Sequence, residues 1–327
     1  MTEQLYIGVD GGQSGTRAVV ANVAGEVLAI GTGPACDHIT APRGYERNRA
    51  AIHGAINDAL EKSGADAKQI IAVGMGLTSA PRELNAQPTF EKIVREIADP
   101  DHIWIDHDAA TNLAGATAGA PGVMVIAGSG SIAYGINQVG GEGRAGGLGY
   151  LMGDEGSAWW IGITALQAAA AAADGRGPET ELLPFVLEYY DLPTIRHIHT
   201  FIYADTFTRP MVSEISVDVA RLAESDKVAR KIMSDAGERL AIMVLATIRQ
   251  IHQPADEVDV YPTGGVFRAG AVITQPFADK LHGEWPEARI QQPHFEPVYG
   301  ALIRGYQQAG IAITSSLLHN LRQPHDS

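Results

Sequence analysis

The stretch Leu5–Gly31, LYIGVDGGQSGTRAVVANVAGEVLAIG, predicts three consecutive β-strands. Apolar residues fill Leu5–Val9, and a glycine-rich turn, Gly11–Gly15, follows them. A second apolar run, Thr16–Asn22, is separated by an Ala-Gly-Glu turn from a third run, Val27–Gly31. Short apolar runs divided by glycine turns are typical of strands joined as hairpins. We therefore expect the chain to open with a three-stranded unit.

The rest of the chain alternates helices and strands, and it then repeats the opening order. The first half is expected to continue with a helix over Arg47–Lys62, a strand over Ile70–Leu77, a helix over Glu91–Ala98, a strand over His102–Asp106 and a helix over Ala109–Ala118. The second half is expected to contain strands over Gly122–Gly128 and Ser131–Gln138, a third strand near Gly143–Ala145, a long helical section over Ser157–Ile251, a strand within Glu257–Phe267, a helix over Ala269–Leu281, a strand at 288–293 and a helix over Val298–Ala309. The order predicts a duplicated α/β fold with a cleft between its halves. The polar tail after Ile311 is expected to be loosely held.

Composition excludes several classes of protein. The chain has 327 residues, which suits one large domain or two ordinary ones. A formal net charge of -14 argues against a nucleic-acid scaffold. Cys36 is the only cysteine, which rules out intramolecular disulfides, cysteine-rich zinc sites and cysteine-ligated clusters. No secretory signal and no convincing membrane span is visible, so we expect a soluble cytoplasmic protein.

Three glycine turns, Gly11–Gly15, Gly128–Gly130 and Gly264–Gly265, each follow an apolar strand. A backbone without Cβ atoms can approach a phosphate closely enough to donate hydrogen bonds to it. Ordinary hairpins use the same residues, so one such turn is weak evidence, whereas three favour a nucleotide site. None of the turns matches the P-loop pattern, and the first is not a dinucleotide fingerprint.

Two aspartates occur where strands are expected to end. Asp10 ends the first strand, and Asp108 ends the HIWIDHD strand directly before a helix. Carboxylates at such places open into the ligand-binding edge of an α/β sheet. Phosphoryl transfer needs an anchored metal and a group that accepts a hydroxyl proton, and these two residues suit those roles. Helix capping is the alternative for Asp108, and Asp106, deeper in the strand, ranks below it.

The stretch GGLGYLMGDEGSAWWIG, Gly146–Gly162, places two adjacent acids, Asp154 and Glu155, between glycines. Ligand binding by Asp154 and an acidic helix N-terminus are both compatible with this pattern. Trp159 and Trp160 lie about 100° apart on a helix, so at most one faces a cleft, and core packing is the simpler interpretation. The histidines His38 and His107 are interpreted as structural hydrogen-bonding groups.

These motifs occur together in a known family. The segments IGVDGGQSGTRAVV, DHDAATNLAGA, VIAGSGSIAYG, GGLGYLMGDEGSAWWIG and TGGVF resemble, in content and order, sugar kinases of the actin/hexokinase/Hsp70 superfamily. The N-acetylglucosamine kinase branch is the most similar, and it shares a family with the ATPases that activate 2-hydroxyacyl-CoA dehydratases. The resemblance covers most of residues 5–309 and is weakest over 175–250. It implies two duplicated actin-like (ribonuclease H-like) domains, 1–118 plus 298–327 and 119–297, with a helical insertion at about 175–250.

The resemblance also implies a role for each motif. Asp10 would orient Mg²⁺, and Asp108 would be the general base on the sugar hydroxyl. The ATP-binding residues would be Gly12, Ser14, Thr16, Gly128, Ser129, Gly130, Ser131, Gly264 and Gly265. The sugar-binding residues would be Asp37, His38, Thr78, Asp108, Gly146, Gly147 and Asp154, with Glu155 and Ser157 supporting Asp154 at a helix start.

Two positions depart from the family pattern. Gln13 stands where the first phosphate loop usually has glycine, and Asp37 replaces the asparagine of a sugar-binding Asn-His pair. An ionised aspartate cannot donate a hydrogen bond, but it could attract the ammonium of glucosamine.

The resemblance implies an ATP- and Mg²⁺-dependent kinase of an amino sugar, N-acetylglucosamine at its 6-hydroxyl. Glucosamine, N-acetylmuramic acid or a broad range of hexoses is the alternative substrate. A dehydratase-activating ATPase is a further alternative, but Cys36 alone cannot supply the usual cluster ligands. A non-catalytic sugar sensor would be expected to have lost Asp108 or the phosphate loops. A homodimer is one option for the oligomeric state.

Overall fold

A computed structural model describes residues 3–12, 14–78, 80, 85–204 and 207–323. The chain forms two compact units, of which the first comprises Met1–Pro121 and Gln292–Ser327 and the second Gly122–Gln291. Gln13 lies outside the described residues.

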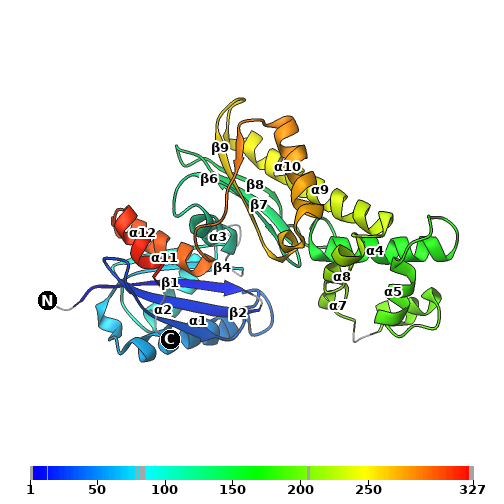
Figure 1. Cartoon of the computed structure of the whole chain (residues 1–327). Helices are drawn as coiled ribbons and strands as arrows, with labels where there is room; N and C mark the ends of the chain where they lie inside the picture. Colours follow the sequence, from blue (N-terminus) through cyan, green and yellow to red (C-terminus); the bar gives the residue numbers. More distant parts are fainter. Residues whose placement is uncertain (1–2, 13, 79, 81–84, 205–206, 324–327) are drawn as a thin grey trace. The chain divides into compact units, whose positions relative to one another are not determined.

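The first unit is a mixed sheet between two layers of helices (Figure 1). Its strands are β1 (Leu5–Gly12), β2 (Gly15–Asn22), β3 (Val27–Gly33), β4 (Ile70–Leu77) and β5 (His102–Asp106), in the spatial order β3-β2-β1-β4-β5. β1, β2 and β3 pair antiparallel, whereas β4 pairs parallel with both β1 and β5. The helices are α1 (Gly44–Ser63), α2 (Gln87–Arg95), α3 (Asp108–Ala116), α11 (Pro297–Gln308) and α12 (Ser315–Leu321), with a 3₁₀ turn, η1 (Ala67–Gln69).

Both faces of this sheet are buried, which explains why its strands are apolar throughout. Alternate residues of a strand point to opposite faces. In β1, Leu5, Ile7 and Val9 join the core under α1 and α2, whereas Tyr6 joins the core under α11 and α12. Gly8 lets α11 approach closely, because a Cβ there would lie 2.4 Å from the Leu302 nitrogen. The sheet is therefore held from both sides, and its carboxyl edge is left for polar groups.

The second unit repeats the same plan. Its strands are β6 (Gly122–Ala127), β7 (Ser131–Ile136), β8 (Glu142–Gly146), β9 (Val258–Thr263) and β10 (Ala288–Ile290), in the order β10-β9-β6-β7-β8. β6, β7 and β8 pair antiparallel, and β9 pairs parallel with β6 and with β10. Since β6 to β10 take the places of β1 to β5 one for one, the predicted duplicated α/β fold is confirmed.

The predicted long helical section over Ser157–Ile251 is confirmed, and the structure divides it into several helices. They are α4 (Ala158–Ala173), α5 (Leu182–Tyr189), η3 (Ile195–His197), α6 (Ile198–Ile202), α7 (Arg209–Ser213), α8 (Ser216–Leu222) and α9 (Lys227–Ile251). Gly175 in the left-handed conformation ends α4, and Asp226 caps α9 by accepting a hydrogen bond from the Ala229 nitrogen. α9 packs on β7 and β8 as α1 packs on β2 and β3, so the helices without a counterpart lie between β8 and α9. η4 (Gly265–Ala269) and α10 (Ala271–Glu284) complete the unit.

The expected loose tail after Ile311 contains a packed helix instead. Thr314 caps α12 through a hydrogen bond from the Leu317 nitrogen, and Leu317 and Leu321 are buried against the first unit. Among the described residues, no helix has the length and apolar character needed to cross a membrane.

Candidate functional site

In the first unit, polar side chains gather at the carboxyl ends of three parallel strands. Asp10 in β1 lies beside Gly76 in β4, and Gly76 in turn lies beside Asp106, the last residue of β5. Thr78 directly follows β4, and its nitrogen donates to the Gly11 carbonyl at 3.0 Å. The carboxyl edge of an α/β sheet is the usual ligand-binding edge. The structure therefore brings the predicted residues Asp10 and Thr78 together there.

Asp108 does not lie at the end of a strand, as we predicted, but in the helix that follows it. β5 ends at Asp106, and His107 caps α3 by accepting a hydrogen bond from the Ala110 nitrogen at 3.2 Å. Asp108 is consequently the first residue of α3 and is half-buried. The carboxylate of Asp106 is buried and accepts from the His107 nitrogen at 2.8 Å. The capping role belongs to His107, so the Asp108 carboxylate is not the cap.

The carboxylate of Asp10 has an unusual proton affinity. Burial raises its pKa to about 7, and the negative charges of Asp108 and Glu296 add to this, while Arg17 opposes it. Arg17 is opposite Asp10 in the sheet register and forms a 2.6 Å ion pair with Glu296. Like charges held close together disfavour the ionised form unless a cation joins them. Among the described residues, no group of three or more His, Cys, Asp or Glu side chains is placed to hold a metal alone.

The first glycine turn is anchored by structural hydrogen bonds. The Cys36 nitrogen donates to the Gly12 carbonyl at 3.0 Å. Thr16 is buried, and its hydroxyl donates to the Pro34 carbonyl at 2.7 Å, whereas Ser14 is exposed. The predicted phosphate contacts of Gly12, Ser14 and Thr16 stay predictions, and Thr16 would have to give up its bond to Pro34 to make one.

Asp37 and His38 follow β3, on a segment that packs against α1. The Asp37 carboxylate forms an ion pair with Arg47 and accepts from the His38 nitrogen at 2.8 Å. The buried side chain of Asn48 holds the Asp37 carbonyl at 2.8 Å. His38 itself is exposed. The charge of Asp37 is therefore already balanced within the protein, a feature that the sequence motif did not indicate.

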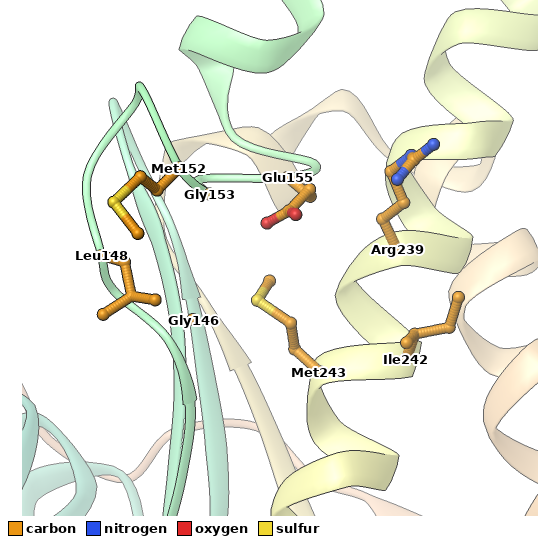
Figure 2. A pocket seen from close by; sticks show the side chains of 8 residues that line it. All are labelled: Gly146, Leu148, Met152, Gly153, Glu155, Arg239, Ile242 and Met243. Atoms are coloured by element: carbon orange, nitrogen blue, oxygen red, sulfur yellow. The ribbon is translucent and has the colours of Figure 1, made fainter.

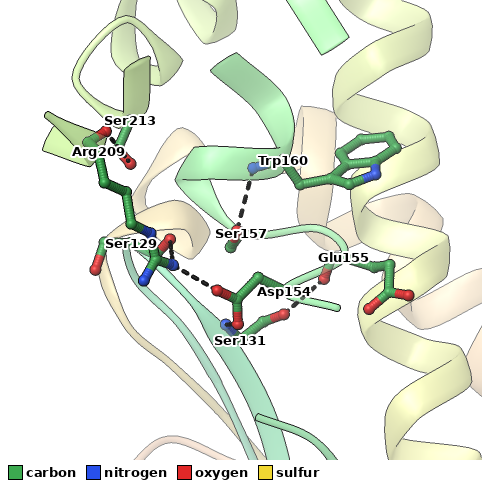
Figure 3. Close-up of polar contacts among 8 residues, drawn as sticks. All are labelled: Ser129, Ser131, Asp154, Glu155, Ser157, Trp160, Arg209 and Ser213. Atoms are coloured by element: carbon green, nitrogen blue, oxygen red, sulfur yellow. Dashed lines mark hydrogen bonds and ion pairs between the residues drawn. The ribbon is translucent and has the colours of Figure 1, made fainter. Parts of the chain in front are cut away.

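In the second unit, the turn Gly128–Ser131 between β6 and β7 is surrounded by polar contacts (Figure 3). Within the turn, the Gly128 nitrogen donates to the Gly130 carbonyl at 2.9 Å. The Gly128 carbonyl accepts a hydrogen bond from the Ala158 nitrogen at 2.8 Å. The Ser131 hydroxyl donates to the Glu155 carbonyl at 2.8 Å. The turn is thus tied to the start of α4.

Asp154 completes this arrangement. It is buried and adopts a left-handed conformation with φ of 61°. One carboxylate oxygen accepts from the Ser131 nitrogen at 3.1 Å, and the other pairs with Arg209. Ser157, not Asp154, caps α4, by accepting from the Trp160 nitrogen at 3.2 Å. The predicted sugar contact of Asp154 stays a prediction, and a sugar hydroxyl would share this carboxylate with Arg209 and the Ser131 nitrogen.

The third glycine turn, Gly264–Gly265, packs against Ala127, the residue that precedes the second glycine turn. Gly264 has φ of 97°, and a Cβ there would lie 2.3 Å from the Ala127 carbonyl oxygen. Only glycine fits such a place without strain. The close approach brings the end of β9 next to the end of β6, where the Gly128–Ser131 turn begins.

A cavity of about 710 Å³ opens beside these two turns. Gly128, Ser129 and Gly265 are among the residues that line it. The remaining lining residues come mostly from α4, α7, α8 and η4: Ala158, Ile161, Pro210, Ser213, Glu214, Ser216, Val217, Ala220, Arg221, Glu224, Met233, Val266, Arg268 and Ala269. The structure therefore joins two turns that are far apart in the sequence into one cavity wall. The residues from α7 and α8 were missed by the sequence analysis, because they carry no motif.

A smaller recess of about 260 Å³ lies at Gly146, one of the two glycines, Gly146 and Gly147, that were predicted to bind the sugar (Figure 2). Gly146, Glu155 and Arg239 line it, together with Leu148, Met152, Gly153, Ile242 and Met243. Gly147 does not line it, and its nitrogen donates to the Ser131 carbonyl at 2.9 Å. Trp159 is buried in the core, and Trp160 stacks under the guanidinium of Arg239 at 5.0 Å.

A family model described as the BadF/BadG/BcrA/BcrD ATPase family matches residues 7–305. The chain is 28% identical to an N-acetylmuramic acid/N-acetylglucosamine kinase of Clostridium acetobutylicum over 302 residues, which are 92% of this chain and 97% of that protein. It is 27% identical to an N-acetyl-D-glucosamine kinase of Dictyostelium discoideum over 319 residues, 93% of this chain and 98% of that protein.

Among solved structures, a protein of Chromobacterium violaceum assigned as an N-acetylglucosamine kinase superposes with a TM-score of 0.74. The two chains are 26% identical, and the match covers 93% of this chain and 99% of the other. The duplicated actin-like architecture is thus shared along nearly the whole of both chains.

Proposed function

Because the chain belongs to the BadF/BadG/BcrA/BcrD ATPase family, we propose that it is an ATP-dependent kinase that phosphorylates an amino sugar, N-acetylglucosamine, at its 6-hydroxyl. The observation that carries this proposal is the cavity formed by Gly128, Ser129 and Gly265. Its volume lies within the range of small-molecule and cofactor sites. Turns that expose backbone N–H groups are suited to phosphates, and the apolar wall beyond them is suited to a base.

The carboxylates of the first unit fit the other half of the reaction. Asp108 is half-buried at the start of α3, where it would accept the proton of the attacking sugar hydroxyl. Asp10 would hold Mg²⁺, because its buried carboxylate lies near the carboxyl end of β1, where the negative charges of Asp108 and Glu296 act on it. When bound, Mg²⁺ would neutralise charge on the phosphates. Magnesium sites of this kind take one or two carboxylates and complete their shell with phosphates and water, so a larger cluster of acids is not needed.

Two features favour an acetylated sugar over glucosamine. The relatives from Clostridium acetobutylicum and Dictyostelium discoideum are both named as kinases of N-acetylated sugars. In addition, Arg47 already balances the charge of Asp37, which leaves that carboxylate less able to attract an ammonium group. Glucosamine, N-acetylmuramic acid and a broader range of hexoses remain the alternative substrates. The homodimer also stays a prediction.

The proposal is tested by measuring ADP release with a panel of sugars: N-acetylglucosamine, glucosamine, N-acetylmuramic acid and glucose. N-acetylglucosamine is expected to give the highest kcat/KM. In parallel, Asp108→Asn is expected to lower kcat by about 10²- to 10⁴-fold, the usual effect of removing a general base. Asp99→Asn is the matched control, because its carboxylate is 89% exposed and pairs only with Arg95 in the described structure.

Two results would contradict the proposal. ADP release that does not depend on any sugar would identify an ATPase rather than a sugar kinase. Turnover of Asp108→Asn at a rate close to that of the parent would show that another group accepts the proton.

A further inference from the structure

Arg209 reaches from α7 into the turn Gly128–Ser131, and no sequence motif pointed to it. Its guanidinium donates to the Ser129 carbonyl and to the Asp154 carboxylate. Asp154 in turn accepts from the Ser131 nitrogen. The ion pair therefore holds the peptide groups on both sides of Gly130, as Figure 3 shows.

Gly130 itself packs against the ion pair. A Cβ at this position would lie 2.9 Å from an Asp154 oxygen and 3.0 Å from a terminal nitrogen of Arg209. These separations are shorter than, or at the limit of, real Cβ contacts, so the turn backbone and the ion pair fit together without spare room. Because the pair is hydrogen-bonded to the Ser129 carbonyl and to the Ser131 nitrogen, a shift of the pair would change its contacts with the turn.

The same arginine also fixes the cavity wall. Pro210, which directly follows it, and Ser213 and Glu214 further along the chain line the 710 Å³ cavity. The guanidinium stacks on the ring of Tyr150 at 5.4 Å, and that ring packs against Trp159 at 4.9 Å. These contacts connect α7 to Tyr150, in the segment before α4, and through it to Trp159 in α4.

Stability alone does not account for this arrangement. The Asp154 side chain is only 4% exposed and that of Arg209 is 29% exposed, so the pair is partly buried, and the attraction between the charges is offset by the cost of removing them from water. The Arg209 Nε–H is buried and has no hydrogen-bond partner in the described part of the chain, which adds a further cost. A pair kept in spite of these costs, and placed against a glycine turn at a cavity, is better explained by what it positions.

We propose that Arg209 is a positioning residue for the nucleotide: through Asp154 and the Ser129 carbonyl it sets the shape of the Gly128–Ser131 turn, and so the binding of the phosphate groups rather than of the nucleoside. This inference rests on the proposed function, because it takes the turn to be a phosphate-binding element. Arg209 does not itself contact the phosphates in this assignment.

The test compares two probes, adenosine and the non-hydrolysable analogue adenylyl imidodiphosphate with Mg²⁺, by calorimetric titration. Arg209→Ala leaves the buried Asp154 charge unpaired and risks unfolding. The informative variant is therefore Arg209→Ala combined with Asp154→Asn, in which the amide oxygen can still accept from Ser131. We expect it to bind the analogue about 10- to 100-fold more weakly, as for lost hydrogen bonds of a charged group, and to bind adenosine as the parent does.

Arg209→Lys and Arg176→Ala complete the set. Arg209→Lys keeps the charge but cannot serve two acceptors in the same fixed geometry, so a smaller loss for the analogue is expected, again without a loss for adenosine. Arg176→Ala is the control, because it removes an exposed arginine that pairs with Asp174. In steady-state assays Arg209→Lys should raise the KM for ATP while the KM for the sugar stays unchanged.

The outcomes separate this inference from the proposed function. If the parent binds neither probe, the proposed function fails first. If the parent binds the analogue and the folded double variant or Arg209→Lys binds it as tightly as Arg176→Ala does, the inference is overturned. Equal losses for adenosine and the analogue would make the pair a structural support of the whole cavity, and a rise in the sugar KM alone would assign it to the sugar site.

Discussion

Replacing Gly264 with alanine tests whether the contact between the ends of β9 and β6 holds the cavity together. Gly264 has φ of 97° and ψ of 167°, a region that is essentially restricted to glycine. A Cβ would also lie 2.3 Å from the Ala127 carbonyl oxygen, which is backbone and cannot rotate away. The backbone strain costs about 1–3 kcal/mol, and relieving the overlap costs about 1–3 kcal/mol more.

The expected destabilisation of Gly264→Ala is therefore about 2–6 kcal/mol, at the upper end of what single substitutions do. For a unit of this size, 1 kcal/mol lowers Tm by about 2–4 °C, so a fall of roughly 10 °C is expected for the second unit. Differential scanning calorimetry measures it, and titration with the ATP analogue measures the loss of binding that should accompany it.

The neighbouring glycine provides the control for this experiment. Gly265 has φ outside the left-handed region, and no described atom lies within 4 Å of a Cβ built there. Gly265→Ala should therefore unfold close to the parent temperature. The reasoning would be refuted if the two alanine variants melted at the same temperature, since they differ only in the strain and the contact with Ala127.

Two further predictions concern the first unit. The Asp10→Asn chain without ligand should be more stable than the parent at pH 8 and should lose kinase activity. Because the pKa of Asp10 is raised to about 7, the stability of the parent should fall as pH rises from about 4 to about 7, and the variant should lack this fall. Thermal melts across that pH range measure the difference, and the same pH dependence in both chains would contradict the prediction. Asp37→Asn should lower kcat/KM for N-acetylglucosamine and for glucosamine by similar factors, because Arg47 already balances the aspartate charge; a loss confined to glucosamine would instead make the free amine the preferred substrate group.

Much of the fold could be predicted from local patterns. The alternation of apolar residues in Leu5–Val9, followed by a glycine turn and a second apolar run, is sufficient to predict a hairpin, because turn residues and strand periodicity act over a few neighbours. The repeat of that pattern after Gly122 then indicated the duplication, which the two matching sheet orders confirm. The family resemblance rested on the same short motifs, and the family match over residues 7–305 confirms it.

The predictions were least accurate where contacts with neighbouring elements determine the bounds of a strand or helix. Asp108 was placed at the end of a strand, but β5 stops at Asp106, and His107 takes the cap that a propensity argument assigns to an aspartate. The helical section after Ser157 was predicted as one region, whereas the bounds of α5, α7 and α8 depend on how these short helices pack on α4.

The sequence by itself determined which residue types are available: three glycine turns, the carboxylates Asp10 and Asp108, and the Asp154 motif. Only the tertiary structure decided how they are used. Arg209 lies 55 residues from Asp154 along the chain, yet the two form a partly buried ion pair against Gly130. Gly265 likewise joins the cavity wall that starts at Gly128. Such pairings have no local signal, because they depend on which surfaces the packed helices and sheets bring within hydrogen-bond distance, and burial then gives those few contacts their strength.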